Sequence, residues 1–78
     1  MEPQLIDFST ALLRLKQGYR VARSGWNGNH MWLEIQRPDA SSKMNLRYVY
    51  MSTAQGDLVP WVCSQTDMMV DDWYEVVR

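Results

Sequence analysis

Apolar positions near the start of the chain recur with the period of a helix. In residues 5–18, LIDFSTALLRLKQG, four apolar side chains fall at this spacing: Leu5, Phe8, Leu12 and Leu15. Asp7 suits an N-cap, and Gly18 suits a C-terminal stop. These signals predict one amphipathic helix whose apolar face packs on a core.

After Gly18 the apolar period changes from helical to alternating, in short runs that turn residues separate. This change is typical of an antiparallel sheet. The runs that predict strands are residues 19–23, 31–36, 47–53, 57–62 and 72–77. The polar segment 37–45 between them is expected to be a loop, and residues 54–56, AQG, form a connection of hairpin length.

Two strands carry more specific signals. In residues 31–36 alternation places Met31, Leu33 and Ile35 on the core face and directs Trp32 away from it. Pro60 has no backbone N–H, so its strand should lie at the sheet edge or carry a bulge there.

The chain has no internal repeat, low-complexity tract or linker that would divide it. We therefore predict one domain over residues 1–78, of α+β class, with the N-terminal helix packed on an antiparallel sheet of four to five strands. A chain near this size buries only about 60% of its unfolded surface. Four Trp, four Tyr and six Met exceed what so small a core encloses. This composition predicts a homo-oligomer.

Single cysteine and histidine residues limit the chemistry of the chain. Cys63 has no intrachain disulfide partner, and His30 has no cysteine at metal-ligand spacing, so neither a disulfide nor a metal site is expected. This usage suits a reducing cytoplasm. No run approaches the roughly 20 apolar residues of a membrane span, and the N-terminus lacks the pattern of a signal peptide. We expect a cytoplasmic protein without membrane contact.

Net charge argues against nucleic-acid binding. Eight basic and nine acidic residues are mixed along the chain and give a net charge of −1. No continuous basic field is available for a DNA or RNA backbone. A small anionic ligand needs only a few donors and remains compatible with this balance.

Catalytic patterns are sparse. A catalytic site composed of Cys63, His30 and Asp67 is formally possible, but nothing in the sequence brings these residues together. Adjacent Asp71 and Asp72 would face opposite ways at a strand start and are poor candidates to share a proton. Phosphate-loop and dinucleotide motifs are absent. We predict a binding protein without catalysis or cofactor, in which aromatic rings stack and neutral polar groups hydrogen-bond.

Two segments are candidates for the binding site. Trp26 lies between two glycines in residues 23–28, RSGWNG, where its ring either folds back onto the core or is displayed to a ligand. Residues 64–67, SQTD, are dense in hydrogen-bonding side chains. They either cap a short helical turn that takes Met68 and Met69 into the core or bind the ligand, and the two roles are compatible.

Four motifs in order give the chain a family resemblance. They are RSGWNG at 23–28, VPW at 59–61, SQTD at 64–67 and DW at 72–73. At this spacing, from about Phe8 to Val77, the chain resembles the phage anti-Thoeris signal-sequestering proteins of the second type. Thoeris is a bacterial defence in which a TIR-domain enzyme makes a cyclic ADP-ribose derivative that activates a killing effector.

The resemblance implies a homo-oligomer, tetrameric in the family, that binds this signal at subunit interfaces without cleaving it. Some members also hold cyclic oligonucleotide signals. On this basis the expected ligand-binding residues are Arg23, Trp26, Asn27, Trp61, Ser64, Gln65, Thr66 and Asp67. The chain departs from the family's usual form in the short polar loop 37–46 and at Gln55, where an acidic residue is common.

Some roles stay open at the level of sequence. Arg23 is a candidate for a ligand phosphate or, equally, for a structural salt bridge. Trp73 is assigned to core or interface, whereas Trp61 is a candidate to face ligand. The alternative function is a small adaptor protein that binds another polypeptide through the same aromatic surface.

Overall fold

The computed structural model describes residues 4–26 and 30–77. Its elements in chain order are α1 (Phe8–Lys16), β1 (Arg20–Arg23), β2 (Trp32–Gln36), β3 (Tyr48–Ser52), β4 (Leu58–Pro60), α2 (Gln65–Met69) and β5 (Trp73–Val76). The strands form one five-stranded antiparallel sheet. The predicted α+β class, with an N-terminal helix on such a sheet, is confirmed.

Helix α1 begins and ends where the sequence signals place it. The Asp7 carboxylate accepts a hydrogen bond from the Thr10 backbone N–H at 2.9 Å, which satisfies one free donor of the first turn. Gly18 follows the C-cap with φ 99°, a conformation that favours glycine. Leu5 was wrongly assigned to the apolar stripe. The cap starts the helix after it, and Leu5 is half exposed while Ala11 is buried on that face.

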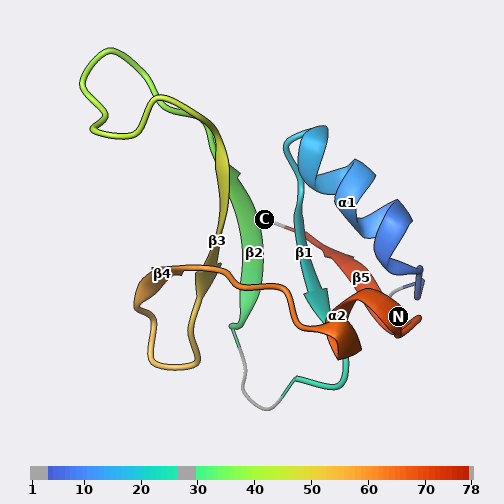
Figure 1. The fold of residues 1–78 in the computed structure, drawn as a ribbon. Coiled ribbons are helices and arrows are strands. Elements are labelled where there is room, and N and C mark those ends of the chain that lie inside the picture. The colour runs from blue at the N-terminus through green and yellow to red at the C-terminus, as the bar shows by residue number, and fades with distance from the viewer. Residues whose placement is uncertain (1–3, 27–29, 78) are drawn as a thin grey trace.

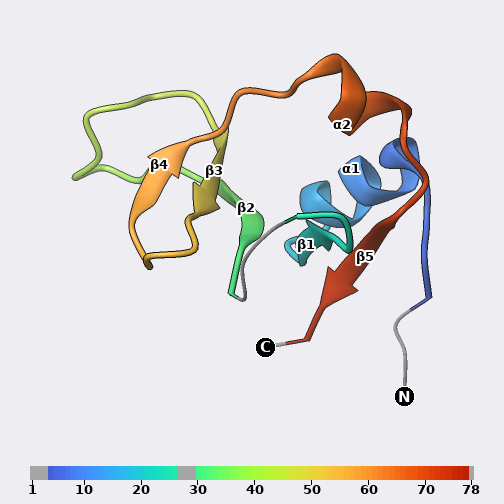
Figure 2. The same ribbon diagram turned by 90° about the horizontal axis from the view of Figure 1, so that it is seen from below.

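The sheet order is β4-β3-β2-β1-β5, so the last strand lies beside the first. Each strand pairs with its neighbour through cross-strand partners, of which Arg23↔Trp73, Val21↔Leu33 and Leu33↔Met51 are three. Helix α1 packs against β1, β2 and β5 on one face of the sheet and leaves β3 and β4 to one side, as Figure 1 and Figure 2 show.

The core lies between α1 and this half of the sheet, with the fully buried Trp73 as its largest side chain. The other buried apolar members are Ala11, Leu15, Val21, Leu33 and Ile35. Trp32 lies on the opposite face, as alternation predicts. There the Arg20 guanidinium stacks on its ring with Cζ 3.7 Å from the centroid, and Tyr50 meets it edge-on at 5.9 Å.

Strand β4 is at the edge of the sheet, which confirms the prediction from Pro60. The β3–β4 hairpin closes through hydrogen bonds from Thr53 N to Asp57 O at 2.8 Å and from Gly56 N to Thr53 O at 2.9 Å. Residues 37–47 contain no helix or strand and form a loop that extends beyond β2 and β3 (Figure 1). Neither described helix is long and apolar enough to cross a membrane.

Candidate functional site

Arg23, at the end of β1, lies between two carboxylates. Its Nη1 donates to Asp67 Oδ1 at 2.8 Å, and its Nε donates to Asp72 Oδ1 at 2.9 Å. Its side chain is only 13% exposed. The hydrogen bond to Asp72 is the main reason why the pKa of Arg23 is raised. The sequence left two roles open for Arg23. The structure shows the salt bridge, and the contact with a ligand phosphate stays a prediction.

Asp72 also fixes the turn that follows β1. Its Oδ2 accepts a hydrogen bond from the Gly25 N–H at 2.9 Å. A Cβ on Gly25 would lie 2.8 Å from the same oxygen, so any larger residue there would displace the Asp72 carboxylate from this position. This role of Asp72 was not predicted from the sequence, where only proton sharing with Asp71 was considered. The non-local pairing of β1 with β5 brings Asp72 to the turn.

Residues Ser64 and Asp67 form a capping box at the start of α2. Ser64 Oγ accepts from Asp67 N at 3.0 Å, and Asp67 Oδ2 accepts from Ser64 N at 3.2 Å. The capping interpretation is confirmed, with Ser64 as the N-cap. Its second part is wrong, because Met68 and Met69 are 45% and 77% exposed. The short helix directs Asp67, and not the methionines, into the protein.

Asp67 is a buried connecting point between three segments. Burial by itself would raise the pKa of its carboxyl. Hydrogen bonds from Arg23 and Ser64, with a smaller contribution from the Trp26 side chain, lower this pKa by more than burial raises it, so the net shift is downward. The group is thus a carboxylate at neutral pH. Both of its oxygens accept hydrogen bonds from within the chain.

Three tryptophans meet beside Asp67. The Trp73 Nε1 donates to the Asp67 carbonyl at 2.9 Å. The rings of Trp26 and Trp61 each meet Trp73 edge-on, with centroids 5.4 and 6.0 Å away. Trp26 is half-buried, so its ring folds partly onto the core and keeps part of its surface accessible. The assignment of Trp73 to the core is confirmed.

The structure gathers most of the predicted site residues around Trp73. Arg23, Ser64 and Asp67 share one hydrogen-bonded network, and the rings of Trp26 and Trp61 each pack against Trp73. The exposed Gln65 and Thr66 form the first turn of α2. Asn27 lies outside the described residues. The role of these residues in binding stays a prediction.

The residues considered for catalysis have other surroundings. The Cys63 thiol contacts the Ser64 carbonyl at 3.4 Å, and burial raises its pKa, so the group is a neutral thiol and a poor nucleophile at neutral pH. His30 is exposed in a turn at φ 72°. Within residues 4–26 and 30–77, no three His, Cys, Asp or Glu side chains are grouped as metal ligands.

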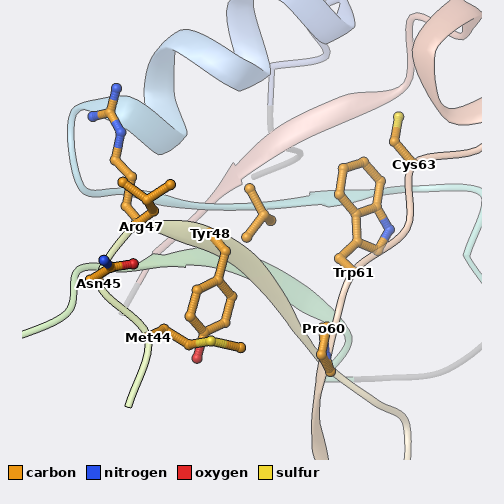
Figure 3. Close-up of a pocket in the computed structure, with 9 residues that line it drawn as sticks. Met44, Asn45, Arg47, Tyr48, Pro60, Trp61 and Cys63 are labelled. Carbon is orange, nitrogen blue, oxygen red and sulfur yellow. The ribbon is translucent and has the colours of Figure 1, made fainter. Parts of the chain in front are cut away.

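An open groove lies over β3, in the half of the sheet that α1 leaves uncovered. It has a volume of about 580 Å³. Its walls come from the loop before β3, from β3, from the end of β4 and from the segment after β4, through Met44, Asn45, Leu46, Arg47, Tyr48, Val49, Pro60, Trp61 and Cys63. Figure 3 shows Arg47 at one end, Cys63 at the other, and the rings of Tyr48 and Trp61 between them. We call this the β3 groove. Of its lining residues, only Trp61 was predicted from the sequence as a site residue.

Comparisons with known proteins identify a family whose model matches this chain. Residues 6–76 match the model of a family described as the Thoeris anti-defense 2-like domain. The matched segment includes every helix and strand of the fold. The chain is also similar to Thoeris anti-defense 2 of Bacillus phage SP01, with 36% identity over 81 aligned positions that cover 87% of this chain and 91% of the relative.

Proposed function

The chain belongs to the Thoeris anti-defense 2-like family, and from this premise we propose that it inhibits Thoeris by holding, uncleaved, the cyclic ADP-ribose-type signal of that defence. The protein acts inside the infected bacterium, where the signal is made. It needs no cofactor and performs no catalysis. A scarce signal molecule that is bound tightly is withdrawn from the effector that it would activate.

The observation that carries this proposal is the junction of Trp26 with the turn at 64–67. An accessible part of the Trp26 ring offers a surface on which a base or ribose can stack. The exposed polar side chains of Gln65 and Thr66 follow on the neighbouring turn, which Asp67 links to Trp26. Stacking surface and hydrogen-bonding groups beside one another are what a nucleotide-like ligand requires.

The proposal includes assembly. We expect a homo-oligomer, a tetramer as the family resemblance implies, with the signal bound near subunit interfaces. Cyclic oligonucleotide signals are a second ligand class. An adaptor that binds another polypeptide is the alternative, and one observation favours it: several large apolar side chains are strongly exposed, among them Leu46, Val62 and Met69.

Mass spectrometry tests the function directly. The purified protein is exposed to the product of a TIR-domain enzyme, washed, and heated to release what it holds. An intact cyclic nucleotide in the released fraction supports sequestration. An altered product would indicate a hydrolase. If nothing is released and nucleotide extracts leave the melting temperature unchanged, the adaptor function is the better explanation.

A further inference from the structure

The charge around Arg23 is unsuited to a phosphate. One guanidinium faces two carboxylates, Asp67 and Asp72, both of which have a lowered pKa and are ionised at neutral pH. The cluster therefore carries a net negative charge. A pyrophosphate brought beside it would be repelled, and the Arg23 donors that point at the carboxylates are already in use.

Basic side chains without an acidic partner gather at another place. In residues 4–26 and 30–77 the ion pairs engage Arg14, Arg20 and Arg23. Four other cations have no such pair: Lys16, Arg37, Lys43 and Arg47.

These four cations lie around one end of the β3 groove. Arg47 lines the groove itself and shares a smaller depression with Lys16 at the end of α1. Arg37 donates to the Lys16 carbonyl at 2.7 Å, which brings it to the same end. Lys43 lines an adjoining depression together with Tyr48, a residue of the groove.

Little negative charge opposes this cluster. Within the loop 37–47 the single acidic residue is Asp39, and its carboxylate accepts hydrogen bonds from Ser41 and Ser42. A chain of net charge −1 therefore has a strongly basic end beside its groove. Such a local field attracts anions although the whole molecule is slightly acidic.

The walls of the groove suit the rest of a nucleotide. Trp61 forms one wall. Its ring packs against the buried Trp73 in a T-shaped pair, with the two ring centroids 6.0 Å apart. Pro60, Val49 and Met44 add apolar surface, and Figure 3 shows the Tyr48 ring facing the same space. The volume of about 580 Å³ lies within the range of about 300–1,000 Å³ that small-molecule sites occupy.

We propose that the β3 groove binds the phosphate-bearing part of a nucleotide ligand, with Arg47 and Lys43 at the phosphates and Trp61 as the stacking surface. This inference rests on the proposed function and adds to it a location for the ligand's negative charge. The Arg23 network then positions Trp26 and the 64–67 turn, and it does not contact phosphate.

Calorimetric titration of the full chain with cyclic ADP-ribose, and separately with inorganic pyrophosphate, tests the proposal. Arg47→Gln should weaken binding of cyclic ADP-ribose at least about tenfold, the factor that one charge-assisted hydrogen bond contributes. The matched control is Arg14→Gln, which removes a cation that is paired with Glu75 and does not line the groove. The affinity of the Arg14→Gln variant for cyclic ADP-ribose should stay within about twofold of that of the unmodified protein.

Cys63 supplies a second measurement that needs no substitution. It is the chain's single cysteine and lines the end of the groove opposite Arg47. Saturating cyclic ADP-ribose should slow its alkylation by iodoacetamide several-fold. This readout remains available even if the Arg47 variant folds poorly.

The outcomes separate the two proposals. If cyclic ADP-ribose binds the unmodified protein while Arg47→Gln has no effect and Cys63 is unprotected, the groove is excluded and the proposed function stands. If neither probe binds the unmodified protein, both proposals are overturned. If Arg47→Gln changes the oligomer mass and leaves the affinity unchanged, the groove is a subunit interface, and the inference is wrong.

Discussion

The surroundings of Trp26 are compatible with both interpretations of its sequence position, a ring that packs on the core and a ring that is displayed to a ligand. Its ring packs against Trp73 in a T-shaped pair, and its side chain helps to lower the pKa of Asp67, while part of the residue stays accessible. A substitution at Trp26 therefore removes some packing as well as the surface proposed for the ligand. Stability and affinity have to be measured on the same variants.

We predict that Trp26→Ala weakens binding of the cyclic signal by about five- to 150-fold, because base stacking on an aromatic face contributes about 1–3 kcal/mol. A nanomolar dissociation constant needs about −12 kcal/mol. A ligand of about 35 heavy atoms gains only about −10 kcal/mol at the efficiency of drug-sized compounds. The site has little affinity to lose, so this variant should fail to sequester.

Thermal melts alongside the titration assign the effect. Trp26→Ala should lower stability far less than Trp73→Ala, since truncation of a fully buried tryptophan costs about 3–5 kcal/mol. Trp32→Ala, on the opposite face of the sheet, is the aromatic control. An unchanged affinity, or a loss of stability equal to that of Trp73→Ala, would assign Trp26 to the core alone.

Asp67→Ala should weaken ligand binding by about 1.5–3 kcal/mol if its carboxylate also accepts hydrogen bonds from the ligand. The structure adds an effect on folding. The change removes half of the capping box and leaves Arg23 with Asp72 as its one partner, and the lost cap and hydrogen bond together should cost about 1–3 kcal/mol. The exposed neighbour Asp71 offers a control, because Asp71→Ala should change neither quantity.

Denaturant titration and calorimetry on the two variants distinguish the roles. Lower stability together with normal binding by the folded fraction would leave Asp67 only its structural role. Equal stability for Asp67→Ala and Asp71→Ala would contradict the structural network itself.

At the scale of elements, local sequence patterns predicted where the helix and strands lie, but they did not predict which strands pair. The Asp7 cap, the Gly18 stop and the alternation around Leu33 each depend on neighbours in sequence, and each is confirmed. Pro60 predicted an edge strand because a missing N–H has the same consequence in any sheet.

Long-range pairing could not be predicted from these patterns. A period of two tells which face a side chain occupies and does not tell which strand lies beside it. The pairing of β1 with β5, and with it the Arg23–Asp72 bridge, was missed for this reason. The β3 groove was missed likewise, because its walls combine residues 44–49 with 60–63.

The junction of β1, α2 and β5 should respond to acid. Asp67 and Asp72 have a lowered pKa in the folded protein, so their contribution to stability is present above the unfolded pKa of about 3.9 and is lost as the pH falls through the folded pKa. We predict that the free energy of unfolding is nearly constant from about pH 7 to pH 5 and falls below about pH 4.

Urea denaturation across this range, repeated with Arg23→Gln, measures the effect. The variant should be less stable at neutral pH and should lose less on acidification, because its two carboxyls no longer face a cation. Asp7 and Asp39, whose pKa is also lowered, supply the remaining slope in both proteins. Parallel pH profiles for the two proteins would contradict this account.

At the scale of the whole molecule, exposed apolar side chains bear on assembly. Leu46, Val62 and Val77 are 77%, 85% and 90% exposed in the single chain. Surfaces of this kind are commonly covered by another subunit. We predict that light scattering at micromolar concentration gives a mass several times the 9.2 kDa of one chain. A particle of 9.2 kDa would contradict the prediction.

The place of β5 in the sheet also determines when the protein can fold during its synthesis. Trp73, the largest side chain of the core, is translated after every other helix and strand, yet it must enter between α1 and the Trp26 turn. Until it leaves the ribosome, Phe8, Trp26 and Trp61 lack the ring against which they pack. Because the closing contact joins Arg23 to Trp73, folding waits for a distant part of the chain. Until β5 emerges, the nascent polypeptide therefore keeps the apolar surface of the preceding elements exposed to chaperones and proteases, and its core closes only at that step.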